Sequence, residues 1–203
     1  MPYRKHLSKD KVMKALIKQH GHFVIDKKKN VCLRLCASVM SQQLSTKVAA
    51  VIFSRFLQLF TTKTPNPSDI LAIPHETLRA IGLSNAKALY LKNICHFFID
   101  NKLTDAKLNK MSNEELIELL TQIKGVGQWT VEMILMFTLA REDVFSTGDL
   151  GLQKAMTRLY SIEYTSSREL AEQMTAIAAH WSPYRTYACR YLWQHLDAPL
   201  VPL

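Results

Sequence analysis

The sequence predicts an all-α fold. Apolar residues recur at spacings of three to four along most of the chain, and capping residues and glycines mark where segments begin and end. Strand-like alternation is confined to residues 23–25 and 162–164, which are too short to found a sheet. Hydrophobic residues make up 48% of the 203, so one domain or two intimate lobes can be packed.

The first half of the chain contains several expected helices. Ser8 is expected to open a helix that Gly21 closes, and a second apolar segment runs from Val31 to about Met40. Ser45 is placed to cap a third helix. After a turn-rich connector at 61–68, two short helices are expected near 69–73 and 75–81. A long helix is then expected from Ser84 to Phe98, after Gly82.

The second half continues the pattern. Ser112 and Glu115 form a capping box for a helix ending near Leu120. Further helices are expected over residues 128–140, 150–159 and 166–181, and from Pro183 onward.

Charge and composition limit the function classes. The net charge is +9, and residues 1–30 carry nine Lys or Arg against two Asp (9 − 2 = +7), which favours a polyanionic partner. No run of 18 apolar residues and no secretory signal are present, so we expect no membrane span and no secretion. The four cysteines are scattered, match no zinc or iron–sulfur spacing, and are expected to be reduced and buried.

The stretch from Leu120 to Gly151 is the most informative. It contains Gly125 and Gly127 in a Gly-Val-Gly hairpin between two helices, and Asp149 between two further glycines. Glycines allow close approach of the backbone to a ligand, and N–H groups at a helix N-terminus bind phosphate without reading sequence. An αα turn with a glycine cap would have the same pattern, and an Asp before a helix is typical of an N-cap.

Four segments together resemble the helix-hairpin-helix DNA glycosylase superfamily, and its 3-methyladenine DNA glycosylase II branch in particular. The likeness covers about residues 30–195 in order. Its segments are Leu120–Met133 followed by Asp149, Ser38–Ser45, Ile81–Leu91, and Trp181–Ala188 followed by Trp193.

The resemblance implies a two-lobed glycosylase fold with the active site in the cleft between the lobes. Residues 31–140 are then the helical barrel lobe that ends in the hairpin. Residues 1–30 and 141–203 form the second lobe, which carries Asp149.

The same resemblance makes Asp149 the catalytic carboxylate. A carboxylate stabilises the positive charge that develops on deoxyribose as the glycosidic bond breaks, and it orients or deprotonates water. N-capping would help to orient it. Glu142 and Asp143 fall outside the motif and are expected to face solvent.

Trp129 stands where bifunctional relatives carry a lysine that attacks the sugar. An indole offers no amine, so the expected reaction is hydrolysis alone. Trp129, Trp193 and Tyr187 match pocket positions whose aromatic faces would hold a cationic alkylated base. Met133 stands where some relatives have a pocket tyrosine, which bears on the range of bases accepted.

Base flipping leaves a gap that a side chain must fill, and Gln42, Gln43 and Leu44 are the candidates. The alternative is a plain turn between helices, and the resemblance favours Gln42 or Gln43 without choosing between them.

The hairpin is expected to contact the DNA backbone and, by resemblance, to hold Na⁺ or K⁺ through the backbone carbonyls of Thr121, Ile123 and Val126. The backbone-contacting residues are Lys124, Gly125, Val126, Gly127 and Thr130. No other cofactor is expected.

The sequence therefore predicts a monomeric base-excision repair enzyme that removes alkylated purines, such as 3-methyladenine and 7-methylguanine, from damaged double-stranded DNA. It would act in the cytoplasm or nucleoid of a bacterium or the nucleus of a eukaryote. The alternatives are a non-catalytic DNA-damage-binding module, a glycosylase for hypoxanthine or mismatched bases, and a lyase that uses another amine.

Overall fold

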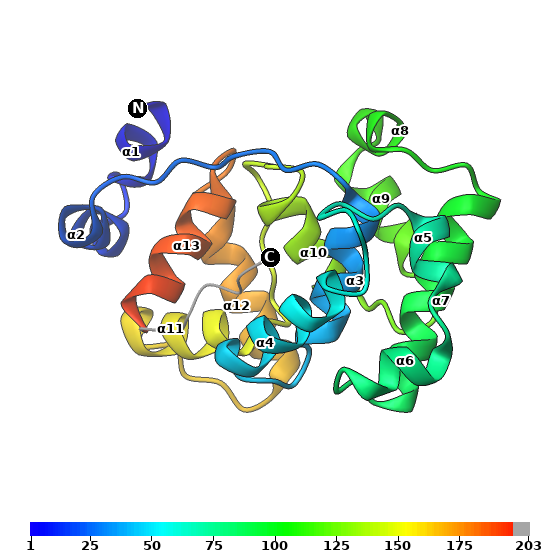
Figure 1. The fold of residues 1–203 in the computed structure, drawn as a ribbon. Coiled ribbons are helices and arrows are strands. Elements are labelled where there is room, and N and C mark those ends of the chain that lie inside the picture. Colours follow the sequence, from blue (N-terminus) through cyan, green and yellow to red (C-terminus); the bar gives the residue numbers. More distant parts are fainter. Residues whose placement is uncertain (197–203) are drawn as a thin grey trace. The chain divides into compact units, whose positions relative to one another are not determined.

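A computed structural model describes residues 1–196, and these contain thirteen helices and no strand (Figure 1). The all-α prediction is confirmed. The described residues form two compact units: unit 1 comprises Met1–Asp26 and residues 140–196, and unit 2 comprises Lys27–Leu139. The boundaries expected after residues 30 and 140 thus fall after residues 26 and 139, and the part of the predicted second lobe at 197–203 lies outside the described residues.

Unit 2 is built around α3, which packs against α4, α7 and α10 (Figure 1). The predicted caps Ser45, Ser84 and Ser112 are confirmed, since each side chain accepts a hydrogen bond from the first turn of its helix. The helices are α3 (Val31–Ser41), α4 (Thr46–Leu57), α5 (Pro67–Ala72), α6 (His75–Ala80), α7 (Asn85–Asp100), α8 (Asp105–Lys110), α9 (Asn113–Leu120) and α10 (Gln128–Phe137).

Two lysines of α7 bind the ends of neighbouring helices. Lys87 Nζ donates to the carbonyls of Met40, at 2.9 Å, and Gln42, at 2.6 Å. Lys92 Nζ donates to three carbonyls at the end of α5. A cation at a helix C-terminus offsets the helix dipole. Burial lowers the pKa of both ammonium groups. Lys87 thereby holds the turn that follows α3.

Unit 2 differs from the sequence expectation at three places. Helix α8, which Thr104 caps, was not predicted. Helix α5 begins at Pro67, inside the expected connector, because Asn66 and Asp69 form a capping box. Helix α10 ends at Phe137, before the expected residue Ala140, whose φ of 55° is incompatible with a continuing helix.

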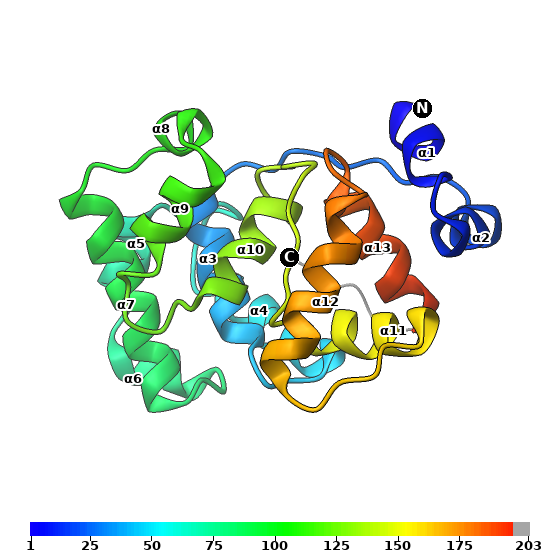
Figure 2. The ribbon, with the colours of Figure 1, turned by 180° about the vertical axis from the view of Figure 1, so that it is seen from behind.

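Unit 1 contains α1 (Pro2–Leu7), α2 (Lys11–His20), α11 (Leu150–Tyr160), α12 (Ser167–Ala179) and α13 (Arg185–His195). Helix α11 packs against α12 and α13 (Figure 2). The expectation that Ser8 opens the first helix is wrong. Ser8 ends α1, and Asp10 caps α2 by accepting from the backbone N–H groups of Val12 and Met13.

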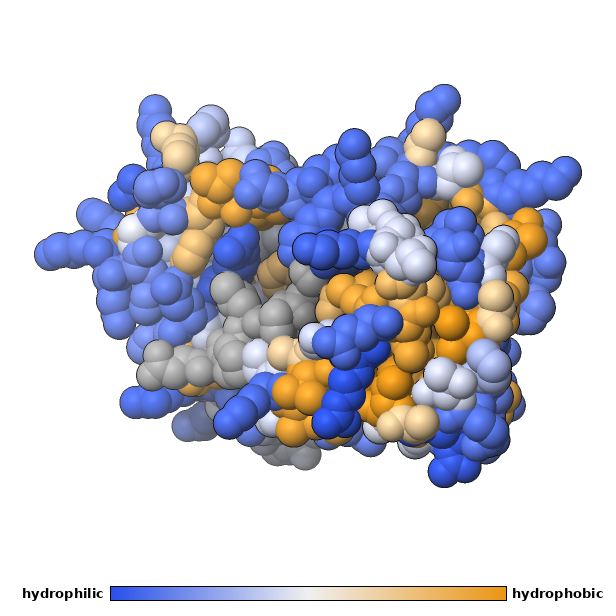
Figure 3. Space-filling model, in the orientation of Figure 1, coloured by the Kyte–Doolittle hydropathy of each residue, from blue (hydrophilic) through white to orange (hydrophobic). Residues whose placement is uncertain are grey.

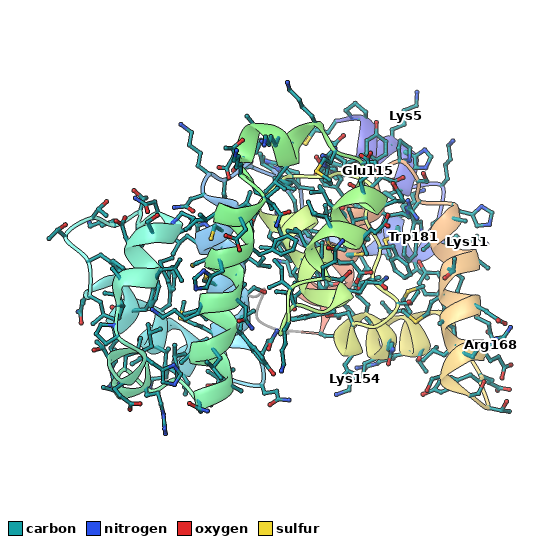
Figure 4. The ribbon with its side chains drawn as sticks, turned by 90° about the vertical axis from the view of Figure 1, so that its right-hand side faces the viewer. Lys5, Lys11, Glu115, Lys154, Arg168 and Trp181 are labelled. Atoms are coloured by element: carbon teal, nitrogen blue, oxygen red, sulfur yellow. The ribbon has the colours of Figure 1, made fainter. Side chains whose placement is uncertain are left out.

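The N-terminal helices are tied to the C-terminal part of unit 1 through Trp181. This indole, labelled in Figure 4, is fully buried. Its Nε1 donates to Asp10 Oδ2 at 3.0 Å. The Tyr160 hydroxyl donates to the same oxygen at 2.8 Å, and burial together with that carboxylate raises the pKa of Tyr160. Helix α12 ends at Ala179, before Trp181, and Pro183 precedes α13 without entering it.

Within residues 1–196, no helix combines the length and apolar character needed to cross a bilayer.

Candidate active site

Asp149 caps α11 in unit 1 and is held from two sides. Its Oδ1 accepts from the backbone N–H of Leu152 and from Trp193 Nε1, each at 2.8 Å. The predicted N-cap position is confirmed. Only 8% of the residue is exposed, so the carboxylate is both oriented and largely removed from water. A carboxylate held this way needs little reorganisation when positive charge develops beside it.

Gly151 makes room for this pair. A Cβ on Gly151 would lie 3.0 Å from Trp193 Cδ1 and 3.1 Å from Asp149 Oδ1, closer than ordinary van der Waals contact. Sequence reasoning noted Gly151 without giving it a role. Its signal is a glycine in the first turn of a helix, where alanine is the better helix former.

The other aromatic residue proposed for unit 1 lies in a different environment. The Tyr187 ring stacks on Tyr3 with centroids 3.9 Å apart, and its hydroxyl donates to Glu142 Oε1 at 2.7 Å. Burial and the Glu142 carboxylate raise the pKa of Tyr187. Trp193 is therefore brought to Asp149, whereas the Tyr187 side chain contacts Tyr3, Tyr184 and Glu142.

The expectation that Asp143 faces solvent is wrong. Arg185 Nε donates to Asp143 Oδ1 at 2.6 Å, and Ser182 Oγ donates to Oδ2 at 2.8 Å. Burial raises the pKa of Asp143, but the bonds from Arg185 and Ser182 outweigh it and lower the pKa. The ion pair holds the start of α13, the helix that carries Trp193. Glu142 is exposed, as expected, but accepts the Tyr187 hydroxyl.

The two glycines of the hairpin in unit 2 have different structural roles. Gly125 has a φ of 102°, and a Cβ there would lie 2.2 Å from the ring of Tyr90. Gly127 is the N-cap of α10, makes no side-chain cap bond, and has no atom within 4 Å of where its Cβ would be. The first turn of α10 therefore begins without a capping side chain, as in anion sites at helix N-termini.

Gln42 joins the turn after α3 to the hairpin. Its Nε2 donates to Thr130 Oγ1 at 3.2 Å and to the carbonyl of Gly125 at 3.5 Å. Thr130 is 2% exposed, so its hydroxyl faces Gln42 inside the unit. Lys124 is exposed, and its carbonyl accepts from Asn93 Nδ2 at 3.3 Å.

A cavity of about 390 Å³ in unit 2 brings Trp129 together with all three gap-filling candidates. Gln43, with a φ of 59°, and Leu44 are exposed at the tip of the turn. The neighbouring surface over α4 has an apolar patch, which includes Val48 and Val51 and is crossed by hydrophilic side chains (Figure 3). Met133 is 1% exposed and does not line the cavity. The lining residues are Ser41, Gln42, Gln43, Leu44, Thr46, Ala49 and Trp129.

Two features indicate the class of this protein: the hairpin with its two glycines, and Asp149 at the N-cap of α11. Residues 36–179 match the family model described as the HhH-GPD superfamily base excision DNA repair protein. The chain belongs to this superfamily, as the sequence motifs predict.

Individual relatives show which branch of the superfamily this chain resembles. The chain is 37% identical over 195 residues to DNA-3-methyladenine glycosylase 1 of Schizosaccharomyces pombe, covering 93% of this chain and 84% of the relative. Among solved structures it resembles the S. pombe 3-methyladenine DNA glycosylase in complex with abasic DNA, with a TM-score of 0.86, 34% identity and 97% of both chains covered. It also resembles the Bacillus halodurans DNA-3-methyladenine glycosidase, with a TM-score of 0.81, 34% identity, and 96% and 88% covered. The predicted resemblance to the alkylpurine branch is confirmed.

Proposed function

We propose that this protein hydrolyses the N-glycosidic bond of alkylated purines, of the 3-methyladenine and 7-methylguanine type, in double-stranded DNA. The observation that carries the proposal is the buried Asp149 carboxylate, which Leu152 N–H and Trp193 Nε1 hold in one orientation. The names of the relatives support the substrate class, and the abasic DNA bound to the S. pombe relative supports DNA as the partner.

Asp149 acts on the sugar. Breaking the glycosidic bond leaves a cation-like deoxyribose, and a fixed carboxylate stabilises this positive charge. The same carboxylate orients or deprotonates the attacking water. Both hydrogen bonds shown for Asp149 go to Oδ1, so they set the direction of the whole carboxylate.

The base leaves readily because alkylation at N3 or N7 makes it cationic. An aromatic face near such a cation contributes about 0.5–2 kcal/mol. Trp129 serves this purpose on the wall of the 390 Å³ cavity, a volume suited to a small ligand. Trp193 acts chiefly by positioning Asp149, and its role as a pocket wall remains a prediction, as do those of Tyr187 and Met133.

The reaction is hydrolysis without strand cleavage. A lyase needs an amine that attacks the sugar to form a Schiff base, and Trp129 occupies the hairpin position that would carry it.

Gln43 or Leu44 fills the gap that the flipped base leaves. Both are exposed at the tip of the turn, whereas the Gln42 side chain is already bound to Thr130 and Gly125. Gln42 then braces the hairpin instead of entering the duplex.

The hairpin binds the DNA backbone through Lys124 and the uncapped first turn of α10. The carbonyls of Thr121 and Val126 accept no hydrogen bond in the described part of the chain, and that of Ile123 accepts one from Val126 N–H. Neutral carbonyl oxygens suit a hard monovalent cation, so these three would hold Na⁺ or K⁺, which when bound draws a DNA phosphate to the hairpin. No other cofactor is proposed. The enzyme acts as a monomer on chromosomal DNA, in the nucleoid or the nucleus.

The test is release of free bases from methylated duplex DNA by the wild type, Asp149→Asn and the control Glu142→Gln. Asparagine keeps an acceptor for Leu152 and Trp193, so the fold and DNA binding are retained. We expect release of 3-methyladenine and 7-methylguanine by the wild type and the control. We expect at least about a 100-fold loss in Asp149→Asn, the size of effect seen when a stabilising group is removed.

Three other results would overturn the proposal. Tight DNA binding without release by any of the three proteins would indicate a non-catalytic damage-binding module. Release of hypoxanthine or mismatched bases with poor release of methylated purines would indicate a glycosylase for neutral lesions. A protein–DNA adduct trapped by borohydride would indicate a lyase.

A further inference from the structure

Three of the four cysteines meet in the core of unit 2. Cys32 and Cys36 lie one turn apart on the same face of α3, and Cys95 lies on α7. Their Sγ atoms all lie within 4.8 Å of one another. The sequence suggested scattered cysteines, because the spacing between residues 36 and 95 does not reveal that α3 and α7 pack together.

This cluster takes no part in the proposed glycosylase reaction. The three residues are 3%, 0% and 0% exposed, so they are closed to DNA and bulk water. Leucine or valine would fill such a core position without sulfur. Three converging thiols therefore offer a chemistry that packing does not require.

The separation of the sulfurs suits a single ion. Three sulfurs bound ~2.3 Å from a shared ion in a plane lie ~4.0 Å apart. The Sγ atoms are already within 4.8 Å, so small side-chain rotations suffice. Thiolates select soft metals. Iron–sulfur clusters take four cysteine-type ligands, and structural zinc takes four ligands.

We propose that Cys32, Cys36 and Cys95 form a three-coordinate site for one soft monovalent cation of the Cu(I) class. Among the described residues the metal-ligating cluster contains only these three side chains, and all three are buried. On binding, three S–H bonds break, three S–metal bonds form, and three protons leave to solvent. No electron is transferred.

Hydrogen bonds within the cluster and burial raise the pKa of the Cys32 and Cys36 thiols, so a bound ion must displace their protons. The Cys32 and Cys36 thiols and the ammonium of Lys92 lower the pKa of the Cys95 thiol despite its burial. A bound ion would join α3 to α7, the two helices on which the position of the Gln42–Leu44 turn depends. We therefore expect the ion to stabilise unit 2.

The test is an anaerobic titration of the reduced, metal-free full chain with Cu(I), in competition with a chromophoric Cu(I) chelator. The expected result is one Cu(I) per chain, a sulfur-to-copper charge-transfer band and a raised Tm. Cys32→Ser and Cys95→Ala should each weaken binding at least tenfold. Cys189→Ala is the matched control, because Cys189 is also buried but lies in unit 1.

A measurement on the wild type keeps the test decisive if the variants fail to fold. X-ray absorption at the copper edge should show three sulfur ligands and no nitrogen or oxygen ligand. The proposal is overturned if the chelator retains the copper, if other ligands are found, if folded Cys95→Ala binds as tightly as the wild type, or if Zn²⁺ binds more tightly than Cu(I).

Discussion

Gly151→Ala should damage the active site through a single added methyl group. The new Cβ would lie 3.0 Å from Trp193 Cδ1, 3.2 Å from Trp193 Nε1 and 3.1 Å from Asp149 Oδ1. Each is tighter than ordinary contact, so the indole and the carboxylate must each move away from the new methyl group by a few tenths of an ångström. The bond that joins them is 2.8 Å long and is the contact most exposed to this change.

Two opposing terms determine the change in the free energy of unfolding. Replacing glycine by alanine in a helix stabilises it by up to about 1 kcal/mol. Losing a hydrogen bond to a charged group costs about 1.5–3 kcal/mol. The second term is larger, so we expect a net destabilisation of about 0.5–2 kcal/mol.

The effect on catalysis should exceed the effect on stability. A misplacement of about 1 Å at a reacting group costs roughly 100-fold in rate, and the shift expected here is smaller. We therefore expect kcat for base release to fall by about tenfold to 100-fold with KM little changed. Single-turnover release of 7-methylguanine and urea unfolding measure the two quantities.

Gly148→Ala is the matched control. Gly148 lies on the other side of Asp149 and would place its Cβ in open space. It should keep the wild-type rate. The reasoning is refuted if Gly151→Ala is more stable than the wild type and equally active, because the helix term would then act alone.

Three further predictions concern other contacts. Gln43→Gly should raise the free energy of unfolding by about 1 kcal/mol, because glycine adopts the left-handed φ of 59° freely. The same substitution should slow base release, because the side chain that fills the gap is lost. Unfolding and activity assays should therefore change in opposite directions. Gly125→Ala should lower stability by more than about 1 kcal/mol in chemical unfolding, and Tyr90→Ala in the same chain should restore part of the loss, since the added Cβ meets that ring. The pKa of Asp143 is lower in the folded protein than in the unfolded chain, so its pairing with Arg185 stabilises the fold at pH values above the unfolded pKa. This stabilisation is lost as the pH falls and the carboxylate becomes protonated. The difference in Tm between the wild type and Asp143→Asn should therefore shrink below about pH 4.

The sequence predicted the helices whose signals are local. Ser84 and Ser112 lie directly before apolar-periodic segments, and each accepts a bond from the turn that it precedes. Helices α5 and α6 were predicted although they have six residues each, so shortness alone does not account for the missed helices α1 and α8, which are equally short. Their presence depends on burial of Tyr3 and Leu108, which tertiary packing decides.

The sequence singled out individual residues of the candidate site but not the contacts between them. Asp149 and Trp193 were each singled out, yet the bond between them spans 44 residues and has no local signal. The same holds for Gln42 and Thr130, which are 88 residues apart. Gln42 and Gln43 are identical neighbours, so only the backbone φ and the side-chain contacts distinguish the brace from the exposed tip.

Asp149 shows why one sequence feature supports two interpretations. The position before a helix favours Asp for its capping bond, and the same bond to Leu152 fixes the carboxylate for chemistry. The indole of Trp193 is what a simple N-cap does not need, because a cap is complete with backbone donors alone. Burying a carboxylate to 8% exposure costs stability, which the hydrogen bonds from Leu152 and Trp193 offset. The second donor, the burial and the glycine that admits the indole together favour catalysis over capping as the reason for this arrangement.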